Sequence, residues 1–103
     1  MKLKKLKKIK INTVVFDIKW DKKSHDGSFL FGTDVAEIEI GCAGTDVEAF
    51  NILCHEIFEI VAIMNWVRYR RPDCESDYLF SYDHRQHAAM MDIFAGIISE
   101  FIA

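Results

Sequence analysis

The segment Glu48–Val67, with the sequence EAFNILCHEIFEIVAIMNWV, decides which fold this chain can adopt. Fourteen of its twenty residues are apolar, which is typical of a helix buried in a protein core. A helix places His55 and Glu59 one turn apart on the same face, with Glu56 beside them. The segment therefore combines a buried helix with one histidine and two carboxylates.

Two carboxylates in an apolar helix need a compensating positive charge, because burying an unpaired ion is costly. The sequence has no Lys or Arg between Lys23 and Arg68, so no nearby residue in the chain supplies that charge. Three solutions remain: protonated carboxyl groups, an arginine from a distant part of the chain, or a bound metal ion. A metal ion would also account for the histidine.

The length and composition of the chain limit the classes of protein it can belong to. A chain of 103 residues, half of them hydrophobic, fits one domain with a compact core and excludes a two-domain enzyme. The three cysteines have no CxxC spacing, which argues against a disulfide framework and against a cysteine-rich zinc site. No segment has the length and apolarity of a membrane span. We therefore expect a cytoplasmic protein that does not contact a membrane.

Charge is distributed unevenly along the chain. Residues 1–23 carry nine lysines and two aspartates, whereas residues 24–103 carry four arginines and fourteen acidic residues. A lysine-rich arm can contact nucleic acid or an anionic membrane, but lysines on an edge strand also block unwanted pairing. The acidic remainder argues against a dedicated nucleic-acid binder. We therefore divide the chain into a Lys-rich N-terminal arm or edge at residues 1–11 and a single domain at residues 12–103.

The first half of the domain has the patterns of strands. Residues 12–20 alternate apolar and polar side chains, as in a half-buried strand. The dipeptide Asp26-Gly27 predicts a turn after it. Ser28–Phe31 and Val35–Ile40 are predicted to be the second and third strands. Together these strands predict a small antiparallel sheet.

The first helix is predicted to begin near Asp46, because Thr45 followed by Glu48 forms a capping box. It is predicted to end at about Val67 or Arg68, where positively charged side chains suit the C-terminal end of a helix.

A second helix is predicted after a loop at residues 73–82. Asp83 followed by Gln86 repeats the capping pattern, and the helix can run almost to Ala103. The complete set of elements predicts an α+β fold, in which a small antiparallel sheet is followed by two long packed helices.

The second helix offers two histidines as a further metal ligand. His87 lies within about 40° of the apolar stripe in residues 91–98, so we expect it to point toward the first helix. His84 lies at the edge of that stripe, in the first turn of the helix. The expected metal site is therefore His55, Glu59 and His87, with His84 as the alternative to His87. Two imidazoles and one carboxylate are a known zinc set that leaves a fourth position for water.

Glu56 has a role beside such an ion. A carboxylate next to a metal-bound water can take the water's proton during attack on a carbonyl carbon, and then pass that proton to the leaving amine. The ion lowers the pKa of the water and polarises the carbonyl, so no activated serine or cysteine is required. The predicted chemistry is hydrolysis of a peptide bond, with Glu56 as the general base.

At this point the sequence resembles a known family. A small sheet, a helix with an HExxH-type motif and a closing helix that supplies the last ligand resemble the minimal gluzincin-type zincins, metallopeptidases that include short phage and prophage proteins. The resemblance covers roughly Thr13–Phe101, and Leu53–Ile60 is similar to the HEIxE variant of those phage proteins. It implies a zincin-like fold, one zinc ion and a peptide or protein substrate. The usual motif has histidine at the position of Glu59. In this chain His87 would supply the second histidine, so that the site again has two histidines and one glutamate.

Two other functions remain open. One is a non-catalytic, metal-stabilised phage or prophage protein that binds a protein partner, because so small a domain offers only a shallow cleft. The other is a metal-free adaptor whose lysine arm contacts nucleic acid. In the peptidase hypothesis, Val35–Ile40 is the edge strand that aligns an extended peptide, and residues 68–82 shape substrate choice. The sequence leaves the substrate, the oligomeric state and the biological pathway open.

Overall fold

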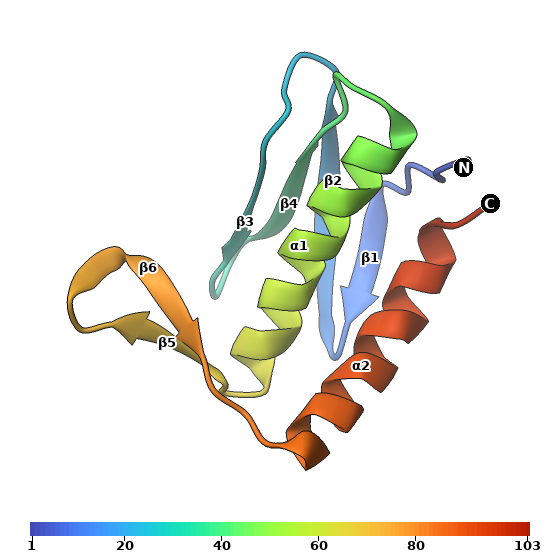
Figure 1. The fold of residues 1–103 in the computed structure, drawn as a ribbon. Coiled ribbons are helices and arrows are strands. Elements are labelled where there is room, and N and C mark those ends of the chain that lie inside the picture. The colour runs from blue at the N-terminus through green and yellow to red at the C-terminus, as the bar shows by residue number, and fades with distance from the viewer.

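The computed structural model describes the backbone of residues 1–103 and the side chains of residues 1–73 and 77–103. The main sheet consists of four strands, β1 (Lys8–Ile11), β2 (Val14–Asp21), β3 (Gly27–Phe31) and β4 (Ala36–Gly41). The other elements are α1 (Asp46–Met64), β5 (Arg68–Arg71), β6 (Cys74–Phe80), α2 (His84–Ile98) and a short 3-10 turn at Ser99–Phe101. The predicted α+β fold is confirmed, and Figure 1 shows α1 packed against the sheet with α2 beside it.

The pairing of strands in the main sheet differs from the predicted antiparallel arrangement. The order is β1-β2-β4-β3, and β2 and β4 are parallel while the other two pairs are antiparallel. The sheet is mixed rather than antiparallel because β4, the later strand, returns to lie between β2 and β3. The predicted edge strand Val35–Ile40 is therefore wrong, since this segment forms the central strand β4. The edges of the sheet are β1 and β3.

The alternation expected for residues 12–20 places apolar side chains in the core. In β2, Phe16 and Ile18 are buried while the alternate residues Val15, Asp17 and Lys19 are exposed. They belong to one hydrophobic cluster with Ile38 and Ile40 of β4 and with the buried face of α1. The cluster holds α1 against the sheet, so the position of the helix is fixed by apolar packing along its whole length.

The lysine-rich N-terminus forms an edge of the sheet. In β1, Ile9 and Ile11 are buried while Lys8 and Lys10 are exposed, which keeps the charged groups in water. Preceding residues run beside the C-terminus, where the Lys4 amide donates to the Phe101 carbonyl at 2.7 Å. The two ends of the chain lie close together in Figure 1.

Helix α1 ends at Met64, earlier than predicted, because the chain turns sharply at Trp66. The Trp66 amide donates to the Ile63 carbonyl and the Val67 amide donates to the Ala62 carbonyl, both at 3.1 Å. This pair of hydrogen bonds is the Schellman motif. Trp66 has a φ of 60°, the left-handed conformation that the motif requires. The turn buries Val67 and leads the chain out of the helix and into β5.

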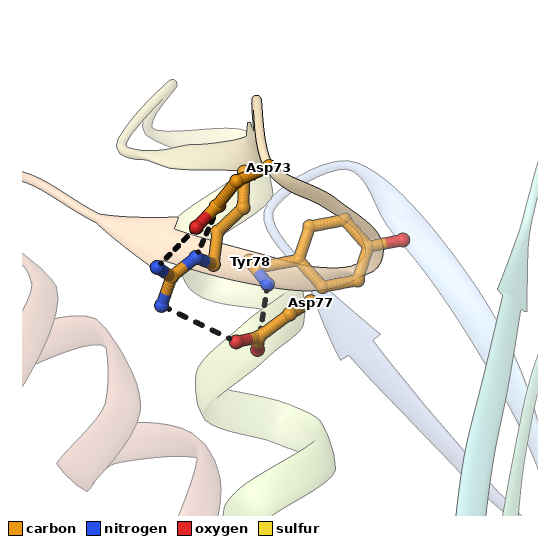
Figure 2. A network of polar contacts seen from close by, with 4 residues as sticks. Asp73, Asp77 and Tyr78 are labelled. Carbon is orange, nitrogen blue, oxygen red and sulfur yellow. Dashed lines mark hydrogen bonds and ion pairs between the residues drawn. The ribbon is translucent and has the colours of Figure 1, made fainter.

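Residues 68–80, predicted as a helix end and a loop, form the antiparallel hairpin β5–β6 instead. A polar network lies at its turn, shown in Figure 2. The Arg71 guanidinium donates to both carboxylate oxygens of Asp73, at 2.9 and 3.0 Å, and lies 3.6 Å from an Asp77 oxygen. The hydrogen bonds from Arg71 lower the pKa of Asp73. Residues 68–80 have too few alternating apolar side chains to predict strands. The sequence pattern also gives no indication of the charge pairing at the turn.

Helix α2 begins as predicted. The Asp83 side chain accepts from the Gln86 amide and the Gln86 side chain accepts from the Asp83 amide, which completes the capping box. The helix packs on α1 through an edge-to-face contact between Phe58 and Phe94, with ring centroids 5.7 Å apart. Within the described part of the chain, neither helix is long and apolar enough to cross a membrane.

Gly27 allows β3 to approach α1 closely, and its replacement tests this contact. A Cβ at position 27 would lie 2.5 Å from the Ile52 side chain and 3.1 Å from the Glu56 side chain. We expect Gly27→Ala to lower the free energy of unfolding by about 1–3 kcal/mol, the usual cost of overpacking. A Cβ at Gly96 meets no described atom within 4 Å, so the control Gly96→Ala should raise stability by about 0.5–1 kcal/mol through helix propensity. Urea unfolding that finds both variants equally stable would contradict this packing.

Candidate metal site

The middle of α1 faces a cleft formed by the edge strand β3 and the hairpin β5–β6. The cleft has a volume of about 560 Å³. Its walls come from three elements that are far apart in the sequence, and they consist of Gly27, Ser28, Phe29, His55, Glu56, Glu59, Arg68, Asp77, Tyr78 and Phe80. The histidine and both carboxylates singled out in the sequence therefore line one cavity.

His55, Glu56 and Glu59 form a group that could hold a metal ion. Each offers one ligand atom, and these atoms all lie within 4.8 Å of one another. His55 Nε2 is 2.6 Å from Glu59 Oε2 and 3.8 Å from Glu56 Oε2. The three residues differ in exposure, since the His55 side chain is 68% exposed whereas that of Glu59 is 17% exposed and that of Glu56 is 9% exposed. An ion could therefore reach the carboxylates from the side of His55.

Arg68 supplies the positive charge that the helix itself lacks. Its Nε lies 3.2 Å from Glu59 Oε1, and its side chain is only 14% exposed. The guanidinium also stacks over the Tyr78 ring, 3.5 Å from its centroid, and lies 5.6 Å from the centroid of the Phe29 ring. Of the three solutions that the sequence left open, the structure therefore realises the distant arginine for Glu59.

The ion pair between Arg68 and Glu59 is close but not aligned as a hydrogen bond. Arg68 Nε is buried and has no hydrogen-bond acceptor among the described residues. A buried donor without an acceptor costs about 1–3 kcal/mol. A modest rotation of the Glu59 carboxylate would provide that acceptor, because Oε1 is already within reach.

Glu56 is the most buried polar side chain of the site. It lies under Gly27 of β3, and burial raises its pKa. The neighbouring Glu59 raises the pKa further, while His55 and Arg68 oppose the rise. Burial therefore disfavours the charged form of the Glu56 carboxyl group.

The structure does not bring His87 together with His55 and Glu59. His87 is exposed and stacks on the Tyr82 ring, with ring centroids 5.7 Å apart. The expectation that it points inward with the apolar stripe is wrong, because α2 packs against a different side of α1 from the one that carries His55. Figure 1 shows α2 and the hairpin on either side of α1. The alternative residue His84 is likewise exposed and outside the group.

Two cleft residues were missed as parts of the site. Phe29 and Tyr78 were not predicted to contact an arginine next to Glu59. Residues 68–82, which include Tyr78, were expected only to shape substrate choice. The available signal was Arg68 itself, the first basic residue after Lys23 in the chain. Sequence alone could not place it, since doing so requires the turn at Trp66.

No protein-family model, no curated protein and no solved structure matches this chain. The resemblance to short phage zincins therefore stays a prediction. A function for this chain has to follow from the geometry and chemistry of its own residues.

The raised pKa of Glu56 predicts how stability depends on pH in the metal-free protein. A carboxyl group whose pKa is higher when folded stabilises the fold at low pH, and this contribution is lost as pH rises through the folded pKa. Glu56→Gln removes the ionisable group while keeping its shape. We therefore expect the melting temperature of Glu56→Gln, relative to wild type, to increase from pH 5 to pH 8 in the presence of a chelator. A difference that stays constant over this range would show that Glu56 is not perturbed by burial.

Proposed function

We propose that His55 and Glu59 bind a divalent metal ion, with zinc as the preferred ion, and that the cleft hydrolyses peptide bonds. The observation that carries the proposal is the group of three ligand atoms within 4.8 Å, placed in a cleft beside an edge strand. The two proposed ligands are one imidazole and one carboxylate, and zinc accepts such mixed nitrogen and oxygen ligands together with water. A bound ion would supply a Lewis acid that polarises the substrate carbonyl and acidifies water.

Glu56 is assigned to proton transfer rather than to metal binding. It is buried next to the two proposed ligands, and its raised pKa brings it closer to the pH at which a general base works best. In this role its carboxylate takes a proton from the attacking water and returns it to the leaving amine. The covering Gly27 limits access of other water to this carboxylate.

The edge strand β3 is assigned to substrate alignment, in place of the segment predicted from the sequence. Within the described sheet, β3 pairs with β4 alone, so its other edge is available for main-chain hydrogen bonds. Gly27 and Phe29 of this strand line the cleft. An extended peptide that adds to β3 would pass in front of His55 and Glu59, which is the β-augmentation mode of recognition.

A non-catalytic, metal-stabilised binding protein is the second candidate. It is favoured by the position of His87 outside the group, because His55 and Glu59 are then one protein ligand fewer than a catalytic zinc site usually has. In that case metal binding would stabilise the cleft for a protein partner, and no peptide would be cleaved.

Metal binding by the two proposed ligands is tested with alanine variants. His55→Ala should weaken zinc binding by more than about 100-fold, because it removes a ligand rather than a residue that supports one. His87→Ala is the matched control, and it should bind zinc like the wild type because His87 lies outside the group. Competition with a coloured zinc chelator measures both affinities. Loss of binding in both His55→Ala and His87→Ala would restore the ligand set predicted from the sequence and reject the present one.

Hydrolysis is tested with Glu56→Gln in the zinc-loaded protein. An amide cannot accept the proton of water, so cleavage of a diverse peptide library should fall by about 10²–10⁴-fold while zinc content is unchanged. Mass spectrometry of the library detects the products. A fully zinc-loaded wild type that cleaves no peptide would favour the non-catalytic binding protein. Equal cleavage by wild type and variant would exclude Glu56 as the base.

A further inference from the structure

We propose that Arg68 is a positioning residue for the metal site, which holds the Glu59 carboxylate so that one oxygen faces the ion. This inference rests on the proposed metal site and adds a determinant of its affinity and geometry. Arg68 does not contact the ion in this arrangement. It acts through Glu59 and through the hairpin that carries it.

The two oxygens of Glu59 have different partners. Oε2 lies 2.6 Å from His55 Nε2, whereas Oε1 lies 3.2 Å from Arg68 Nε. An ion between His55 Nε2 and Oε2 would therefore leave Oε1 available to Arg68. Outer-shell partners of this kind orient a ligating carboxylate and change the affinity for the metal.

Arg68 is held firmly enough to orient another side chain. Its guanidinium is stacked 3.5 Å over the Tyr78 ring, which comes from β6, and it also faces Phe29 of β3. Its backbone follows the buried Val67, whose carbonyl accepts from the Ser81 amide at 2.9 Å. Two aromatic rings therefore contact the planar guanidinium, and a flexible lysine could not reproduce this stacking.

The Nε atom of Arg68, which has no aligned hydrogen-bond acceptor, also supports this role. The buried donor lacks an aligned acceptor among the described residues, although Glu59 Oε1 is within 3.2 Å. An ion bound between His55 Nε2 and Glu59 Oε2 would move these two atoms apart from their 2.6 Å contact, and an accompanying rotation of the Glu59 carboxylate that aligns Oε1 with Nε would satisfy the donor. Metal binding and the hydrogen bond would then stabilise each other.

The experiment compares Co²⁺ binding to the full chain in wild type, Arg68→Gln and Arg70→Gln. Co²⁺ occupies zinc-type sites and has visible absorption bands that report the coordination geometry. We expect Arg68→Gln to bind Co²⁺ about 10–100-fold more weakly and with shifted bands, since Glu59 is no longer oriented. Arg70 lies on the same strand and is exposed, so Arg70→Gln should match the wild type in both measurements. Circular dichroism checks that each variant is folded.

Arg68→Lys keeps the charge and serves if Arg68→Gln does not fold. It should bind Co²⁺ more weakly than wild type with shifted bands, because it cannot stack on Tyr78 in the same way. Wild-type affinity and bands in either folded Arg68 variant would overturn the positioning role alone. Tighter binding in Arg68→Gln would overturn it too, and would show that Arg68 competes with the ion for Glu59. A wild type that binds neither Co²⁺ nor zinc would overturn the proposed metal site, and this inference with it.

Discussion

Glu56 and Glu59 lie on a helix that packs against the sheet through apolar side chains. The negative charge of each carboxylate therefore has to be compensated by groups close to it. Glu59 faces Arg68 at 3.2 Å, whereas Glu56 has no such close cation in the described structure and its pKa is raised by burial. The same helix face presents His55 to both carboxylates. The residues that surround these two charges come from α1, β3 and the hairpin, and together they form one site.

Several backbone features serve this arrangement. The left-handed conformation of Trp66 ends α1 and redirects the chain, so that Arg68 returns toward Glu59. The network around Arg71 closes the far end of the hairpin, and the hairpin also carries Tyr78, whose ring stacks on the Arg68 guanidinium. Gly27 lets β3 approach the helix over Glu56.

The sequence predicts the elements that depend on local patterns. Alternation in β2 and the cap residues Thr45 and Asp83 are found where expected, because each is determined by residues close together in the chain. The parallel pairing of β2 with β4 depends on contacts between distant segments, and the predicted antiparallel sheet missed it. The hairpin at residues 68–80 was missed because this stretch has too few apolar side chains to predict strands.

The candidate site likewise has one part that the sequence predicts and one part that it does not. His55, Glu56 and Glu59 are brought together by the period of a single helix, so their grouping follows from the sequence. The inward orientation expected of His87 failed, because it required knowing which side of α1 the second helix covers. Arg68 was assigned to the C-terminal end of the first helix, whereas its contact with Glu59 depends on the turn at Trp66.

The central claim is that a metal ion binds on α1 between His55 and Glu59. The most direct test is a crystal structure of the zinc-loaded protein with anomalous differences measured on both sides of the zinc absorption edge. The account predicts one strong peak at about 2.0–2.2 Å from His55 Nε2 and from Glu59 Oε2. A peak at His84 or His87 instead, or a cleft without zinc in crystals of protein that carries stoichiometric zinc, would contradict it.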